Sequence, residues 1–83
     1  MNNSTRDRAS RALRDRITDA AVELLINEGV AKTTTVAVQK RAGVSRGALL
    51  HHFPSRAQLL ASTIERLVRL NEQQITSSFL NGA

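Results

Sequence analysis

The 83-residue sequence contains no cysteine, tryptophan or tyrosine, only one proline and two phenylalanines. Without cysteine the chain forms no disulfide and no thiolate metal site, which fits a reducing compartment. No apolar run approaches the ~18 residues that a membrane span needs, and no hydrophobic segment follows the arginines near the N-terminus. We therefore expect a cytoplasmic protein without a membrane segment. The scarcity of aromatics also argues against a single-strand binder that stacks bases.

The positive charge is concentrated in one part of the chain. Of the net charge of +5, residues 1–56 contribute ten of twelve Lys and Arg against five of seven Asp and Glu. Because each neutralised phosphate releases counterions, this surplus indicates a polyanionic partner, nucleic acid first and an anionic membrane surface second. The alternative is a solvated helix face, in which the arginines of residues 6–16 are interleaved with Asp7 and Asp15.

The spacing of apolar residues predicts an all-α domain that begins with a long helix. Its buried stripe consists of Leu13, Ile17, Ala20, Ala21 and Leu24. Gly29 is expected to end this helix as a left-handed cap. Ser4 and Ser10 are alternative N-caps, and residues 1–10 are expected to form a frayed basic arm.

Two short helices joined by a tight turn follow. Thr34 is the predicted N-cap of the first, and Gly43 ends it. Ser45 caps the second, which Pro54 cannot continue. A helix, a Gly-containing turn and a second short helix are the parts of a helix-turn-helix, predicted here over residues 34–53.

A longer fourth helix is predicted after this motif, with Ser55 as its cap and its end near Gly82. Its apolar stripe, interrupted by Asn71, comprises Leu59, Leu60, Ile64, Leu67, Val68, Ile75 and Phe79. Such a stripe also permits a second interpretation of the chain, as a truncated helical interaction module that acts through its fourth helix without reading DNA.

Three blocks of the sequence resemble the N-terminal domain of the TetR family of transcriptional regulators, over about residues 11–71. They are RDRITDAAVELLINEG at 14–29, TTTVAV at 33–38 and RAGVSRGALLHHFPSRAQLL at 41–60. The resemblance implies a sequence-specific regulator of transcription that binds double-stranded DNA. Among regulators, it implies a repressor before an activator. Its recognition helix, residues 45–52, would lie in the major groove.

The resemblance also implies which residues contact DNA. By matched position, phosphate contacts are expected from Thr33, Thr34, Ser45, Arg46, His52 and Arg56. The outward positions of the recognition helix add Gly47, Ala48, Leu50 and His51. Gly47 costs about 1 kcal/mol against Ala within a helix, and we interpret it as allowing close approach to DNA.

Three residues depart from the family pattern. Leu50 stands where the family usually has a Tyr that reaches the DNA backbone, so that contact is missing. Ala48 replaces a frequent Thr and keeps only a methyl group, which can meet a thymine methyl. Gln39 occupies a place where a small Ala usually lets the two helices approach.

The largest departure is length, because the family continues into a helical domain that binds a small molecule and dimerises. Residues 72–83 are expected to be only the end of the fourth helix and a stub, so the effector and dimerisation domain is absent. We expect no small-molecule effector, and only weak homodimerisation on a palindromic site. The chain is either an isolated domain of a longer regulator or a naturally short protein.

The adjacent histidines do not indicate a metal site or an enzyme. Neighbouring helical residues point about 100° apart, so His51 and His52 cannot both face one metal ion. A serine near them, Ser45 or Ser55, lacks an orienting carboxylate and a pocket. We therefore predict no catalytic residue, no metal and no cofactor.

Overall fold

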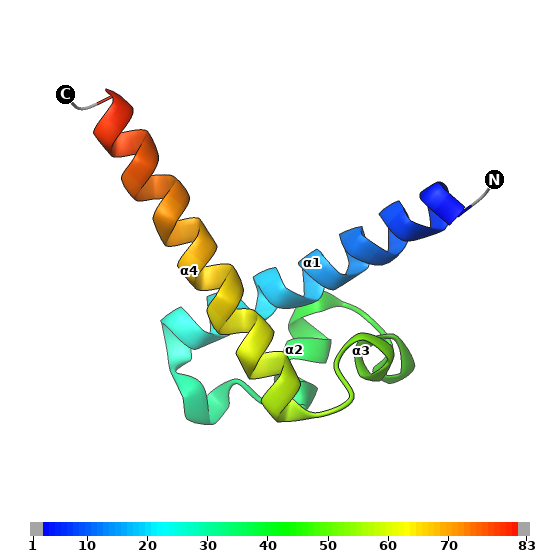
Figure 1. Ribbon diagram of the computed structural model, residues 1–83. Helices are drawn as coiled ribbons and strands as arrows, with labels where there is room; N and C mark the ends of the chain where they lie inside the picture. The colour runs from blue at the N-terminus through cyan, green and yellow to red at the C-terminus, as the bar shows by residue number, and fades with distance from the viewer. Residues whose placement is uncertain (1–2, 82–83) are drawn as a thin grey trace.

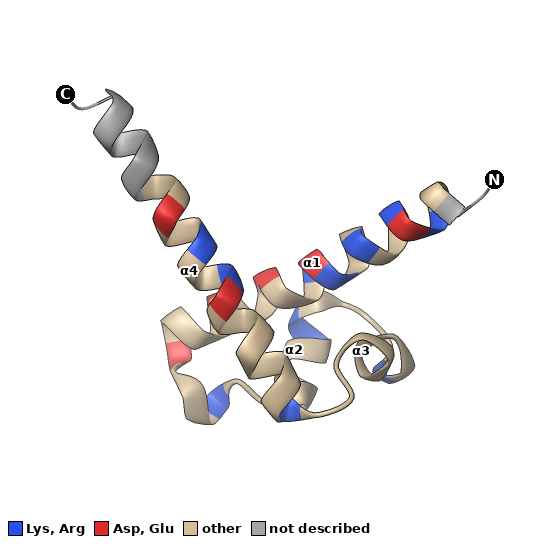
Figure 2. Cartoon of the chain, in the orientation of Figure 1, with Lys and Arg blue, Asp and Glu red and all other residues tan. Residues whose placement is uncertain are grey.

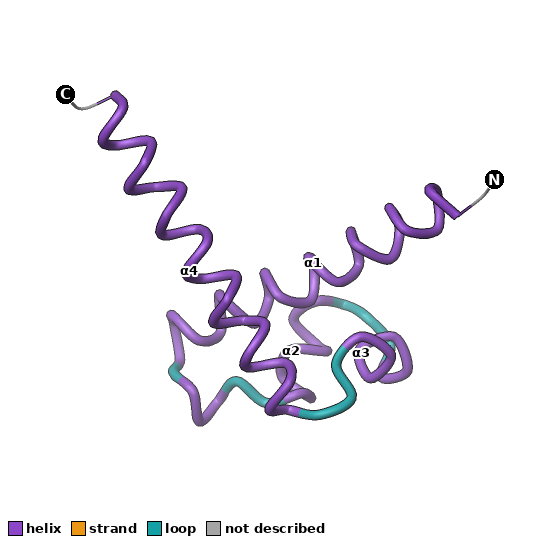
Figure 3. The backbone as a smooth tube through the Cα atoms, in the orientation of Figure 1, coloured by secondary structure: helices purple, strands orange, loops and turns teal. Residues whose placement is uncertain are grey.

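The computed structural model describes the backbone of residues 3–81 and the side chains of residues 4–74. This part of the chain contains α-helices, one short 3-10 helix and no strand, which confirms the all-α prediction (Figure 1). The elements are α1 (Asn3–Glu28), η1 (Val30–Lys32), α2 (Thr35–Ala42), α3 (Arg46–His52) and α4 (Arg56–Asn81). Only short loops separate them (Figure 3). The N-terminal half of α1 and the C-terminal half of α4 project from the body as diverging arms; α3 lies on the side toward which the α1 arm projects, and η1 lies on the other side (Figure 1).

Side-chain caps fix the starts of α2 and α3, as predicted. Thr34 Oγ1 accepts a hydrogen bond from the Ala37 N–H at 3.1 Å, and Ser45 Oγ accepts one from the Ala48 N–H at 3.0 Å. Each bond satisfies a backbone donor that has no partner within the helix. The boundaries of both helices therefore follow from local sequence.

The turn between α2 and α3 depends on Gly43. This residue is left-handed, with φ of 67°, and its N–H and that of Val44 both donate to the Gln39 carbonyl, at 3.0 and 3.2 Å. The pattern satisfies the free carbonyl of the last helical turn. A Cβ at Gly43 would be strained and would lie 3.2 Å from the Arg16 guanidinium. Gln39 does not prevent α2 and α3 from packing together.

The start of α4 also agrees with the sequence. Ser55 Oγ accepts a hydrogen bond from the Gln58 N–H at 3.2 Å. The preceding helix ends where the Phe53 N–H donates to the Leu49 carbonyl at 2.8 Å, and Pro54 lies in the loop between the two helices.

The core lies where α1 crosses α2, α3 and the first turns of α4. It consists of Ile17, Ala20, Ala21, Leu24, Val38, Ala42, Leu49, Phe53 and Leu59. The Phe53 ring is 1% exposed, and the Arg14 guanidinium lies over it, 5.1 Å from its centroid. Arg14 Nη2 also donates to Ser62 Oγ at 3.2 Å. Arg14 is thus a structural residue, a role that its place among the basic residues of α1 did not indicate.

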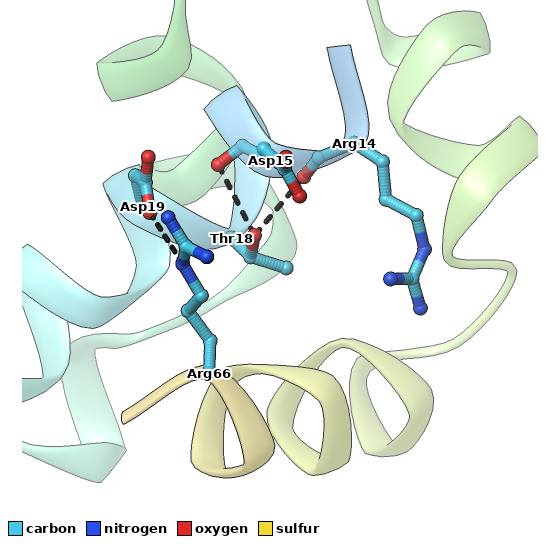
Figure 4. A network of polar contacts seen from close by, with 5 residues as sticks. All are labelled: Arg14, Asp15, Thr18, Asp19 and Arg66. Atoms are coloured by element: carbon cyan, nitrogen blue, oxygen red, sulfur yellow. Dashed lines mark hydrogen bonds and ion pairs between the residues drawn. The ribbon is translucent and has the colours of Figure 1, made fainter. Parts of the chain in front are cut away.

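Polar contacts fasten α1 to itself and to α4 (Figure 4). The buried Thr18 hydroxyl lies 3.1 Å from the carbonyls of both Arg14 and Asp15. Arg66 Nε of α4 donates to an Asp19 carboxylate oxygen at 3.0 Å. Within the described side chains no buried polar atom lacks a hydrogen-bond partner.

The N-terminal arm is helical where the structure describes it. Residues 1–10 were expected to be frayed, but from Asn3 onward they form the first turns of α1. Their side chains from residue 4 on are exposed, so no apolar periodicity marked them as helical. The backbone of residues 3–10 is therefore helical in this structure, and fraying of this exposed segment stays a prediction.

The apolar stripe of α4 is covered only at its start. Leu59 is buried and Leu60 and Leu67 are half-buried, whereas Ile64 and Val68 are 53% and 49% exposed. The remaining stripe residues, Ile75 and Phe79, lie outside the described side chains. Among the described residues, no helix is long and apolar enough to cross a membrane.

Candidate nucleic-acid interface

The surface of α3 divides into an exposed face and a face against the core. Arg46, Gly47 and His51 are exposed, as is the cap residue Ser45. Leu50 differs from the expectation of an outward position, because it is half-buried and packs against the core. The exposed face of α3 is therefore centred on its first turn and on His51.

Gly47 is the most open position on this face. A Cβ built there meets no other atom within 4 Å, and its φ is not in the left-handed region. The chain's own packing therefore does not require a glycine at this position. Glycine weakens a helix by about 0.5–1 kcal/mol relative to Ala. At position 47 it leaves a flat backbone surface to which a partner can come close.

Two residues expected to contact phosphates take part in a structural link between η1 and α4. Thr33 is 0% exposed, and its hydroxyl donates to the Gly29 carbonyl at 2.8 Å. We correct the expectation for Thr33, because a buried hydroxyl that is already bonded does not reach a phosphate. Arg56 donates from Nη2 to the Val30 carbonyl at 2.8 Å and from Nε to the Thr33 carbonyl at 3.3 Å. Arg56 thereby holds η1 against the start of α4. The residue as a whole remains exposed to solvent.

Arg56→Ala is expected to lower stability as well as DNA affinity. Loss of the two hydrogen bonds costs about 1 kcal/mol, which lowers Tm by about 4–8 °C in a domain of this size. Arg56→Lys is the matched variant, because it keeps the charge but not the two-pronged donation to Val30 and Thr33. Thermal unfolding and a mobility-shift titration should show reduced Tm in both variants and reduced affinity only in the alanine variant. Wild-type Tm in either variant would contradict the structural role.

His52 lies half-buried between its neighbours. Its ring meets His51 edge-on, with centroids 5.1 Å apart, and is tilted to Phe53 at 6.3 Å. Burial lowers the pKa of His52 below its ordinary value of 6.5, and the nearby positive charges of His51 and Arg14 lower it further. At neutral pH His52 is therefore uncharged and can offer a partner one ring N–H but no positive charge.

The helix-turn-helix lies in a part of the chain without carboxylates. Residues 29–64, from just before η1 to the third turn of α4, contain no Asp or Glu. Their basic residues are Lys32, Lys40, Arg41, Arg46 and Arg56. In Figure 2 acidic residues lie on α1 and the outer part of α4, and none lies on α2 or α3. The surface around α3 therefore does not repel a polyanion.

The groove between α1 and α2 carries charges of both signs. It is an open groove of about 500 Å³, lined by Asp15, Asp19 and Glu23 and also by Arg16 and Arg41. Arg41 of α2 is drawn to this side, where its Nε donates to a Glu23 carboxylate oxygen at 2.8 Å. Because Asp19 is likewise paired with Arg66, the charges of this groove are largely matched within the chain, and we do not count it as part of the candidate interface.

Comparison with known proteins agrees with this geometry. The family model described as bacterial regulatory proteins, tetR family, matches residues 17–63, which run from the core of α1 through α2 and α3 into α4. The chain belongs to the TetR family. Its helix-turn-helix is therefore a DNA-binding domain of transcriptional regulators, as the sequence resemblance implied, and the family is one of regulators rather than enzymes.

Individual relatives of this TetR-family chain match only through their own N-terminal parts. Nucleoid occlusion factor SlmA of Aliivibrio fischeri is 47% identical over 53 residues, 63% of this chain and 27% of the relative. The HTH-type transcriptional regulator SrpR of Pseudomonas putida is 37% identical over 51 residues, 61% of this chain and 24% of the relative. An uncharacterized HTH-type regulator of Mycobacterium tuberculosis is 33% identical over 61 residues, 74% and 31% of the two chains. The chain thus spans about a quarter to a third of these relatives' lengths, and no solved structure matches it.

Proposed function

We propose that this TetR-type domain binds double-stranded DNA sequence-specifically, places α3 in the major groove and acts as a transcriptional repressor. The proposal is supported by the exposed face of α3 around Gly47, which lies within a carboxylate-free segment. A recognition helix contacts base edges with its N-terminal residues, and Arg46 is the first residue of α3. A repressor of this kind acts by occupying its operator in the cytoplasm.

The proposed contacts fall into two groups. Residues that would meet the groove floor are Gly47, Ala48, Leu50 and His51; residues that would meet phosphates are Thr34, Ser45, His52 and Arg56. Arg46, the first residue of α3, would bind either a guanine or a phosphate. Contacts of the second group fix the protein on any duplex, whereas those of the first discriminate between sequences. The half-buried Leu50 would offer only its exposed edge to a base. We leave Thr33 out of this proposed set because its side chain is buried.

These residues are proposed to read DNA and nothing more. The chain spans 24–31% of the relatives described above, so regulation by an effector belongs, in our proposal, to the remaining part of such proteins. Dimerisation on a palindromic operator is likewise proposed to be weak for these residues alone.

A salt titration tests the proposal. Affinity for a duplex selected from a random pool should fall at least about 50-fold between ~50 and ~200 mM salt, because released counterions give log K a steep negative slope against log[salt]. A scrambled duplex of equal length should bind more weakly at each salt concentration, and this ratio measures specificity. A mobility-shift assay or fluorescence anisotropy supplies both quantities.

The same titration tests the second candidate function, an interaction module acting through α4. The exposed Ile64 and Val68 favour it. Apolar pairing of helices responds little to salt, whereas phosphate binding weakens steeply. Affinity that is independent of salt and of sequence would rule out the DNA-reading proposal and leave the α4 module.

A further inference from the structure

The N-terminal turns of α1 form a charged extension that the helix-turn-helix does not use. Side chains 4–12 are all exposed, and Leu13 is the first residue of α1 that packs against the core. At 1.5 Å per residue, about 14 Å of helix therefore stands outside the body. We call residues 4–12 the α1 extension. It carries Arg6, Arg8 and Arg11 and a single carboxylate, Asp7.

The α1 extension has no apolar face with which to pack on a protein. The core stripe of α1, followed backward from Leu24 and Ile17 at helical spacing, continues as Ser10 and Arg6. The side of the helix that covers the core in the body is therefore polar and basic in the extension. A partner that fits this surface is hydrophilic and negatively charged.

The arginines of the extension are available to such a partner. Among the described residues, none of Arg6, Arg8 and Arg11 forms an ion pair. Arg11 Nε lies 3.4 Å from the backbone carbonyl of Asp7, not from its carboxylate. Their guanidinium charges are therefore not neutralised by the part of the chain that the structure describes.

The extension leaves the body beside α3. Arg14, which follows it on α1, lies over the ring of Phe53, the residue at the C-terminal end of α3. Arg11 lies one turn before Arg14 and Arg6 about two turns before it, on the same half of the helix. In Figure 2 the basic N-terminal end of α1 projects from the side of the body that carries α3, while the outer part of α4 diverges from it.

We propose that the α1 extension contacts the phosphate backbone beside the segment of DNA that α3 reads. The inference rests on the proposed function, since it adds contacts to the same complex. Arg6 and Arg11 would bind phosphates, and Arg8, which points about 160° away from Arg6 around the helix, would add its charge to the field of the extension. These contacts add affinity and reach without reading sequence. The extension thereby enlarges the footprint of a domain whose recognition helix has only seven residues.

The test compares two variants with the same change in net charge. R6Q/R8Q/R11Q removes three positive charges from the extension, and R69E/Q73E removes three from exposed positions of α4. Each is titrated with salt on a selected 30-base-pair duplex and on a scrambled duplex of that length. Circular dichroism and Tm confirm the fold; the extension's side chains are exposed and none packs on the body, so Tm should not change.

The extension variant should lose about 2 to 3 units of slope in log K against log[salt], and the α4 variant less than half a unit. The ratio of selected to scrambled affinity should stay unchanged in both. A wild-type slope near zero would overturn the proposed function itself. A steep wild-type slope that the extension variant retains would overturn only the proposed role of the extension. Equal losses in both variants would assign the effect to net charge, and would also overturn it.

Discussion

Gly47→Val is expected to abolish sequence-specific binding while the domain stays folded. Nothing lies within 4 Å of a Cβ at this position, so the branched side chain fits the free protein. In the proposed complex the same side chain would project between α3 and the groove floor and keep the base-contacting residues from their partners. Affinity for the selected duplex should fall about 10³-fold, to the level of non-specific binding, in a mobility-shift assay.

Gly47→Ala is the matched control for the valine variant. Replacing Gly by Ala in a helix stabilises it by about 0.5–1 kcal/mol, so Tm should rise while affinity falls less than for valine. Binding would thus decrease with side-chain size and not with stability. Normal binding of the selected duplex by Gly47→Val would show that this face of α3 does not lie against DNA.

The local features of this fold could be predicted from the sequence because each depends on neighbouring residues. Thr34, Ser45 and Ser55 each bond to an N–H three residues ahead, so a short window of sequence contains both partners. Gly43 likewise ends α2 through bonds to the residues just before it. The order of the helices, the caps of α2, α3 and α4 and the turn of the helix-turn-helix were therefore predicted correctly. Gly29 was not, because its φ of 89° and ψ of 172° lie outside the left-handed α conformation expected of it.

The contacts between distant residues could not be predicted in this way. Arg56 is 26 residues from the Val30 carbonyl that it binds, and the sequence pattern showed only a basic residue at a helix start. Thr33 looked equally free, although packing buries it completely. Both were expected at phosphates because family position describes a typical contact, while burial depends on how η1 and α4 meet in this chain.

The helical conformation of residues that do not pack on the core could not be predicted from the sequence either. Residues 3–10 lack an apolar stripe, the signal on which helix prediction depends, yet they continue α1. Extending an existing helix adds one hydrogen bond for each residue fixed and needs no new nucleus. The helix thus continues past the core as far as Asn3.

Covalent linkage of two copies is expected to increase affinity for a palindrome by about 10²- to 10⁴-fold. Helix-turn-helix dimers place two recognition helices one helical turn of DNA apart, about 34–36 Å. A single copy has one such helix, of seven residues, and must recruit the second from bulk solution. A flexible Gly/Ser linker of about 60 residues, with a root-mean-square span of roughly 43 Å, replaces that bulk concentration by a millimolar effective one.

A duplex with one half-site is the control, because the linked protein should bind it no more than about twofold better than the single chain. The result depends on how strongly the free single chain dimerises. Ile64 and Val68 are the exposed apolar residues through which α4 of one copy can contact α4 of another.

Burying these side chains contributes only about 25 cal/mol per Å² against the free-energy cost of association. We therefore expect sedimentation of the free single chain to show a weak, concentration-dependent dimer. If the single chain instead bound the palindrome as tightly as the linked protein, and I64S/V68S removed that affinity but not half-site binding, α4 would be a sufficient dimer interface. The proposed weak half-site reader would then be replaced by a dimer built from these 83 residues alone.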